Sequence, residues 1–60
     1  MLYHLYRLQG FRLTGADDLE AADDGEAARL ARVRAGSDAA ELWRGNRRIR
    51  TIPPLAGTRT

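Results

Sequence analysis

The sequence of 60 residues contains no cysteine, no lysine and a single histidine. Without cysteine the chain can form no disulfide and offers no thiolate to a metal, and one imidazole cannot build a histidine-rich zinc site. Small domains usually need such supports, because they bury only about 60% of the surface that the unfolded chain exposes. We therefore expect no metal and no cofactor, and we expect self-association to stabilise the fold instead.

Long apolar runs are also missing. No stretch approaches the ~20 consecutive apolar residues that a membrane-spanning helix needs. The opening segment MLYHLYRLQG lacks the basic start, apolar centre and small-residue cleavage pattern of a signal peptide. Together with the absence of cysteine, these features favour a cytoplasmic protein that does not contact a membrane.

Few residues could carry catalytic chemistry. His4 is the only histidine, no serine or cysteine nucleophile accompanies it, and the only serine, Ser37, fits a turn. The acidic run DDLEAADDGEA could be aligned with a calcium loop through Gly25, but the bidentate acid would then fall on Ala31. We predict no enzyme activity, no catalytic residue and no small-molecule substrate.

The charges that are present are unevenly distributed. All eight acidic residues lie between Asp17 and Glu41, and seven of the ten basic residues lie between Arg29 and Arg50. Every basic residue is arginine, whose planar guanidinium suits phosphate and stacks on aromatic rings. The alternative interpretation is compositional, because an arginine-rich and alanine-rich chain without lysine is typical of a GC-rich genome.

The N-terminal third predicts two strands, over residues 2–8 and 11–21, joined by a tight turn at Gln9-Gly10. Gly15 predicts a bulge or bend in the second strand. This turn would pair Leu8 with Phe11 and Tyr6 with Leu13. Side chains alternate along a strand, so one apolar face is expected to hold Leu2, His4, Tyr6, Leu8, Phe11 and Leu13, and the other Tyr3, Leu5, Arg7, Arg12 and Thr14.

A helix is predicted next. Asp23 can cap it, Glu26 completes a pattern resembling a capping box, and Gly36 fits the left-handed position that follows a helix. The segment EAARLARVRA consists largely of good helix formers. The expected apolar stripe is Ala27, Leu30, Ala31 and Val33.

A second hairpin is predicted around Gly45-Asn46, a pair typical of type II′ turns. A two-residue turn sets Arg44 opposite Arg47, Trp43 opposite Arg48, Leu42 opposite Ile49 and Glu41 opposite Arg50. The fold class is therefore α+β, with the order ββαββ and a four-stranded antiparallel sheet covered by one helix on one face. Residues 1–52 form a single domain, and residues 53–60 are expected to be a flexible C-terminal tail because two prolines end the last strand.

One helix can cover only one face of such a sheet, so the other face is the candidate binding surface. Arg44 opposite Arg47 is unfavourable within the hairpin and invites an anion or a partner carboxylate. We predict a protein–protein interaction or homodimerising module, with nucleic-acid binding through arginine and aromatic side chains as the alternative. The predicted binding face consists of Tyr3, Leu5, Arg7, Arg12, Trp43, Arg44, Arg47, Arg48 and Arg50.

Three motifs carry a resemblance: an initial YHLY strand over residues 3–6, an acidic helix entry ADDGEA over residues 22–27, and the ELWRGNR hairpin over residues 41–47. In these the chain resembles a family of short bacterial proteins with a domain of unknown function. The resemblance implies the ββαββ layout and no particular activity. More distantly, the order of elements is similar to the partial RNase-H-like fold of the HicB antitoxins, which implies a protein partner.

Overall fold

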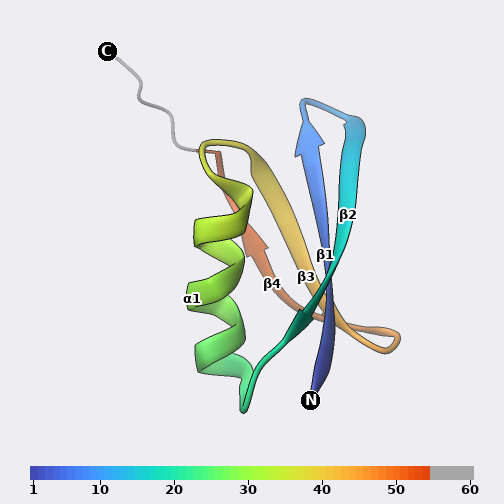
Figure 1. Ribbon diagram of the computed structural model, residues 1–60. Helices are drawn as coiled ribbons and strands as arrows, with labels where there is room; N and C mark the ends of the chain where they lie inside the picture. The colour runs from blue at the N-terminus through green and yellow to red at the C-terminus, as the bar shows by residue number, and fades with distance from the viewer. Residues whose placement is uncertain (55–60) are drawn as a thin grey trace.

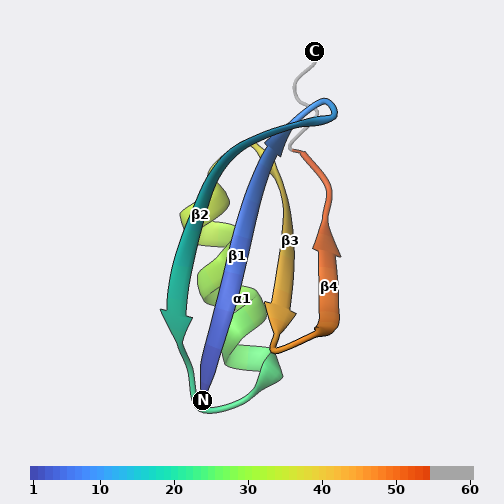
Figure 2. The same ribbon diagram turned by 90° about the vertical axis from the view of Figure 1, so that its right-hand side faces the viewer.

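The computed structural model describes residues 1–54 and consists of one antiparallel sheet and one helix. The sheet has four strands in the order β2-β1-β3-β4, and α1 lies against one of its faces (Figures 1 and 2). This confirms the α+β class and the ββαββ order. The elements are β1 (Leu2–Gln9), β2 (Arg12–Glu20), α1 (Asp24–Ala35), β3 (Ala39–Arg44) and β4 (Arg47–Ile52).

The first hairpin turns one residue later than predicted. Gln9 pairs with Arg12, so the two turn residues are Gly10 and Phe11, and Gly10 has φ of 63°. No other residue type has positive φ among residues 1–54, which makes this a type II′ turn with glycine in its first central position. The predicted pairs of Leu8 with Phe11 and Tyr6 with Leu13 are therefore wrong.

Both hairpins contain a register irregularity. In the first, Leu8 pairs with Leu13 whereas Arg7 pairs with Gly15, so Thr14 is the extra residue; the bulge predicted near Gly15 is confirmed. In the second, the turn at Gly45-Asn46 and the pair of Trp43 with Arg48 are as predicted. Beyond that pair the register shifts.

The shift in the second hairpin changes the partners further from the turn. Leu42 pairs with Arg50 and Glu41 pairs with Thr51, so the predictions of Ile49 opposite Leu42 and of Arg50 opposite Glu41 are wrong. Ile49 is the extra residue and remains packed at the margin of the core. A bulge redirects the side chains that follow it, and here it turns Arg50 to the helix side of the sheet.

Local capping explains where α1 begins and ends. The Asp23 carboxylate accepts a hydrogen bond from the Glu26 backbone N–H (2.8 Å), and the Glu26 side chain accepts one from the backbone N–H of Ala22 (2.7 Å). At the other end Gly36 has φ of 63° and its N–H donates to the carbonyls of Arg32 and Val33. These predicted caps are confirmed.

The buried stripe of α1 consists of alanines. Ala27, Ala31 and Ala35 are buried, whereas Leu30 and Val33, which were predicted in the stripe, are 38% and 78% exposed. Positions spaced by four residues share one side of a helix, and with only methyl groups on that side the helix axis can approach the sheet closely. The core lies between this stripe and the sheet and includes Tyr3, Leu5, Leu19, Ala21, Ala40, Leu42 and Ile52.

Pro53 and Pro54 follow β4 and belong to no strand. The rest of the predicted flexible tail, residues 55–60, lies outside the described residues. No helix within residues 1–54 has the length and apolar character needed to cross a bilayer.

Candidate interaction surface

The face of the sheet opposite α1 carries no second layer in the described part of the chain, and Figure 2 looks onto it with α1 behind the strands. We call it the open face. Its side chains alternate with those that point at the helix, and register assigns them from all four strands. They are Leu2, His4, Tyr6 and Leu8 of β1, Leu13, Ala16, Asp18 and Glu20 of β2, Ala39, Glu41 and Trp43 of β3, and Arg48 and Thr51 of β4.

Tyr3 and Leu5 lie on the opposite face from the one predicted. Both are fully buried beneath α1, so their assignment to the open face is wrong. The alternation along β1 is as expected, but the helix covers the other set of side chains. His4, Tyr6 and Leu8 therefore point outward.

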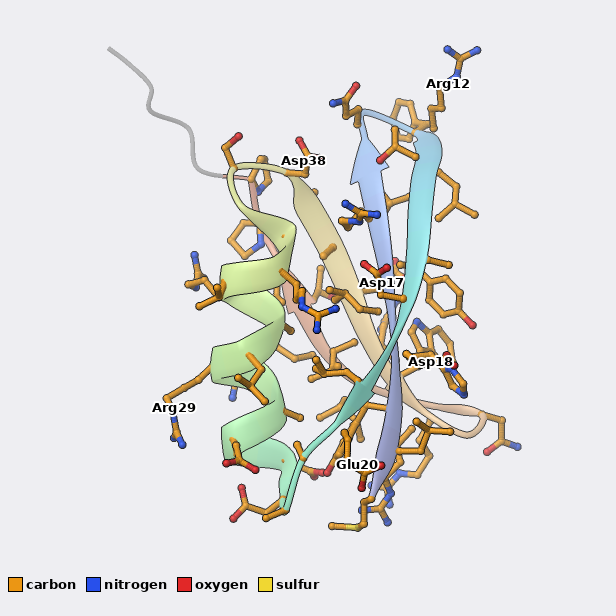
Figure 3. All side chains as sticks on the ribbon, viewed as in Figure 1. Arg12, Asp17, Asp18, Glu20, Arg29 and Asp38 are labelled. Carbon is orange, nitrogen blue, oxygen red and sulfur yellow. The ribbon has the colours of Figure 1, made fainter. Side chains whose placement is uncertain are left out.

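Two predicted arginines are also displaced from the open face. Arg7 points to the helix side, where its Nε lies 3.4 Å from Asp17 Oδ2; this buried Nε has no hydrogen-bond partner among residues 1–54. Arg12 pairs with Gln9 on the same side, and Figure 3 shows it extending beyond the end of the hairpin. Both assignments to the open face are wrong.

The four arginines of the second hairpin separate in space. Arg48 lies on the open face opposite Trp43, 4.0 Å from the Glu41 carboxylate. Arg44 is paired with Arg47 as predicted, but its guanidinium reaches Asp24 at the start of α1 (3.8 Å). Arg50 pairs with the buried Leu42 and points to the helix side, so its predicted place on the open face is wrong.

Arg44 belongs to a small polar cluster at the base of the helix. The buried Tyr3 donates its hydroxyl hydrogen bond to Asp24 Oδ1 at 2.6 Å. That hydrogen bond, with burial adding to it and Arg44 opposing it, raises the pKa of Tyr3 above its ordinary value. The cluster connects β1, α1 and β3, and it is a structural feature of the covered face.

Trp43 is on the open face as predicted and is half-buried. Its indole Nε1 donates to Glu41 Oε1 at 3.1 Å. Backbone pairing places Trp43 beside His4 of β1, and His4 lies beside Asp18 of β2, with Nδ1 and Oδ1 3.0 Å apart. In Figure 3 Asp18 is on the side away from α1, whereas Asp17 is between the sheet and the helix.

One row of side chains therefore crosses the whole open face. It runs from an acid on the β2 edge, through two rings, to an arginine on the β4 edge, and we call it the central row: Asp18, His4, Trp43 and Arg48. The next row toward the β1–β2 turn, the Tyr6 row, is Ala16, Tyr6, Glu41 and Thr51.

The two edge strands differ in charge in the same direction as the central row, with acids on β2 and arginines on β4. β2 contains three acids, Asp17, Asp18 and Glu20, while β4 contains Arg47, Arg48 and Arg50 and no acid. Charged side chains on edge strands hinder pairing of like edges between copies. Among the described residues no three His, Asp or Glu side chains gather in a group that could hold a metal ion.

Sequence reasoning missed His4, Tyr6, Leu8, Leu13 and Asp18 as residues of the open face. A usable signal was the position of Gly10, because a type II′ turn takes glycine first and so begins at Gly10. Moving the turn by one residue corrects the pairing at the hairpin end. It does not decide which face α1 covers.

No family model, no curated protein and no solved structure matches the chain.

Proposed function

We propose that this protein is a homodimerising module in which the open faces of two copies pack against each other. The observation that carries the proposal is the order of the central row: acid, ring, ring, arginine. When a second copy presents the same row in the opposite direction, each acid meets an arginine and each ring meets a ring. Half-buried rings and aliphatic side chains rimmed by charges are typical of surfaces that bind a partner.

The geometry supports a two-fold arrangement. An axis parallel to the strands and midway between β1 and β3 places β2 of one copy over β4 of the other. Asp18 then faces Arg48 of the second copy, and His4 faces its Trp43. In the Tyr6 row the same axis brings the Tyr6 hydroxyl to the Glu41 carboxylate of the second copy.

The size of the face predicts a weak dimer. Four strands spaced by about 4.8 Å, with about six residues each at about 3.3 Å per residue, cover roughly 400 Å² per copy. Standard interfaces bury about 800 Å² of accessible surface per partner. We therefore expect dissociation in the micromolar range or weaker, and the concentration must be varied in any test.

The resemblance to the HicB antitoxins, which act by binding a toxin protein, points to the same class of function, a protein partner. A cytoplasmic location is part of the proposal, because a chain without cysteine suits a reducing compartment.

Charge reversal in the central row tests the two-fold arrangement. Asp18→Arg places arginine opposite Arg48 at both ends of the interface, and Arg48→Asp places two acids opposite each other. Each variant should be monomeric by sedimentation equilibrium at concentrations where the wild type dimerises. An equimolar mixture of the two variants should form a heterodimer, because each reversed position then meets its complement.

Arg12→Asp is the matched control, since it reverses an exposed arginine away from the open face and should leave the dimer unchanged. Trp43→Ala should weaken the dimer about tenfold or more, as expected for a central aromatic anchor. A wild type that stays monomeric up to millimolar concentration would refute the proposal, as would a mixture of the two reversed variants that does not associate.

The alternative, nucleic-acid binding on the open face, has less support from the geometry. Base stacking requires rings beside several cations, whereas among residues 1–54 Arg48 is the only arginine whose side chain the register places on that face. Binding of a single-stranded oligonucleotide that is lost in Trp43→Ala while the oligomeric state is unchanged would favour the alternative.

A further inference from the structure

A groove of about 380 Å³ lies between α1 and β4, on the helix side of the sheet and therefore separate from the open face. The alanine stripe of α1 packs on the other strands of the sheet, so the helix covers the β4 edge incompletely (Figure 2). The lining of the groove combines cationic and apolar side chains, among them Ala28, Arg29, Arg32 and Val33 of α1 and Arg50 and Ile52 of β4.

The arginines within residues 1–54 fall into two groups, those that make an ion pair and those that do not. Arg7, Arg44 and Arg48 each lie within 4.0 Å of a carboxylate. By contrast, Arg29, Arg32 and Arg50 make no ion pair with any residue from 1 to 54, which is also true of Arg12, Arg34 and Arg47. The three groove arginines are distinguished by their place, because they line one groove in which no acidic side chain of residues 1–54 takes part. Positive charge gathers there without an internal counterion.

Two separate features of the chain bring these arginines together. Arg29 and Arg32 are three residues apart and so lie on neighbouring turns of one helix side. Arg50 reaches the groove because the bulge at Ile49 turns it toward α1. Without that bulge it would follow the predicted register and lie opposite Glu41 on the open face.

We infer that the α1–β4 groove binds a small organic phosphate, with the phosphate on Arg29, Arg32 and Arg50 and the apolar part of the ligand on Val33 and Ile52. Guanidinium groups bind phosphate oxygens through paired hydrogen bonds. The volume falls in the range of about 300–1,000 Å³ typical of small-molecule sites and exceeds what one phosphate would fill. Val33 is 78% exposed, so an apolar group placed on it would gain contact area.

The inference concerns a bound ligand and no reaction, because the residues that line the groove include neither a nucleophile nor a general base. It does not depend on the proposed dimer, since the groove and the open face are on opposite sides of the sheet.

Titration of the full chain with ADP at low ionic strength, followed by calorimetry, tests the inference. Inorganic pyrophosphate and adenosine separate the two parts of the ligand: ADP should bind more tightly than either. Arg50→Ala and Arg32→Ala should each weaken ADP binding about tenfold or more, the effect expected for loss of a charge-assisted hydrogen bond.

Two matched controls remove the same charge outside the groove. Arg34→Ala lies on the same helix as Arg32, and Arg47→Ala on the same strand as Arg50, and both should change the ADP affinity by less than about twofold. Equal losses in the control and groove variants would overturn the inference, because they would indicate general charge attraction.

A fourth variant, Val33→Asp, adds a carboxylate at the rim of the groove on an exposed position and should abolish ADP binding with the fold intact by circular dichroism. Trp43→Ala should leave ADP binding unchanged whether or not it disrupts the dimer. Failure of ADP to bind would overturn the inference, as would an oligonucleotide that binds through these arginines while ADP does not.

Discussion

At the scale of single residues, Tyr3 combines an apolar role with a polar one. Its ring is fully buried beneath α1, yet its hydroxyl reaches Asp24 in the first turn of the helix at 2.6 Å. A buried tyrosine usually needs such a partner for its polar end. The hydrogen bond therefore ties the start of the helix to the first strand.

This contact predicts a dependence of stability on alkaline pH. Because the pKa of Tyr3 is raised in the folded state, the folded chain keeps the phenol proton where the unfolded chain loses it. The stabilisation is complete below the ordinary tyrosine pKa of about 10 and is lost as the pH rises through the folded-state pKa. The free energy of unfolding, measured by urea denaturation from neutral pH upward, should fall more steeply in the wild type than in Tyr3→Phe.

Tyr6→Phe is the control for that experiment, since Tyr6 lies on the open face and has no such partner among residues 1–54. Its alkaline profile should follow the wild type at concentrations that keep the chain monomeric. Identical slopes for the wild type and Tyr3→Phe would contradict the assigned role of the Asp24 contact.

The side on which Tyr3 lies could not be predicted from β1 alone. Both alternating sets of that strand are largely apolar: Leu2, His4, Tyr6 and Leu8 on one side, Tyr3, Leu5 and Arg7 on the other. The choice depends on contacts made far along the chain, with α1 and β3. The side of the sheet on which Trp43 lies was easier to predict. On β3 the alternating set with Ala40 and Leu42 is apolar and packs beneath the helix, so Trp43 lies on the other side.

At the scale of elements, the close approach of α1 to the sheet depends on side-chain size. Ala27 and Ala31 have no exposed surface, and larger neighbours such as Leu30 and Val33 lie at the sides of the helix. Hydrophobicity alone predicted Leu30 and Val33 in the buried stripe. The space between the helix and the sheet decides which side chains are buried, and this space cannot be read from the sequence.

Enlarging the stripe should therefore be destabilising. We expect Ala31→Leu to lower the free energy of unfolding by about 1–3 kcal/mol, the usual cost of overpacking a filled core. Val33→Leu, a comparable change at an exposed position of the same helix, should alter it by less than about 0.5 kcal/mol. Chemical denaturation of both variants measures the difference, and equal effects would show that the helix can move away from the sheet without penalty.

The glycine that follows the bulge in β2 has a packing reason. Gly15 lies opposite Arg7, and a Cβ at position 15 would collide with the Arg7 guanidinium, which is held near Asp17 between the sheet and the helix. The absence of a side chain at Gly15 therefore leaves room for an arginine on the covered face.

A double-mutant cycle tests this arrangement. In the wild type Gly15→Ala should be less favourable by about 0.5–1 kcal/mol than in an Arg7→Ala background, because the end of the Arg7 side chain must shift to make room for the methyl group. In an Arg7→Ala background the same substitution should be neutral or stabilising, since alanine is less costly than glycine in a strand. Equal effects of Gly15→Ala in both backgrounds would contradict the packing explanation.

Local chemistry explains which elements could be predicted. The caps at Asp23 and Gly36 and the turn at Gly45-Asn46 depend on neighbouring residues, and all three are confirmed. The bulge at Thr14 was signalled by the neighbouring Gly15, whereas the bulge at Ile49 had no such local signal. The register beyond each bulge, and with it the position of Arg50, could not be read from spacing.

At the scale of the whole molecule, strand order decides which residues meet. Because β1 pairs with both β2 and β3, the central row joins residues separated by up to 44 positions in the chain. Neither the order β2-β1-β3-β4 nor the row follows from the two hairpins taken separately. The candidate surface is still the face that the helix leaves uncovered. Most of the residues predicted to form it lie elsewhere.

The molecule offers two routes to association, and they differ in stoichiometry. Face-to-face packing closes after two copies, whereas pairing of the acidic β2 edge with the basic β4 edge of the next copy would continue without limit. The measured mass in the charge-reversal experiment separates them. A species limited to two copies supports the open-face dimer, and a mass that keeps rising with concentration supports edge pairing.

The unlike edges also give the sheet an electric dipole that lies in its plane and crosses the strands. Two copies related by the proposed axis hold these dipoles antiparallel, an attractive orientation that acts over about 10 Å at moderate salt. A freely tumbling copy would thus be rotated toward the productive alignment during approach, which raises the rate of encounter even though the net charge of +2 on each copy is repulsive.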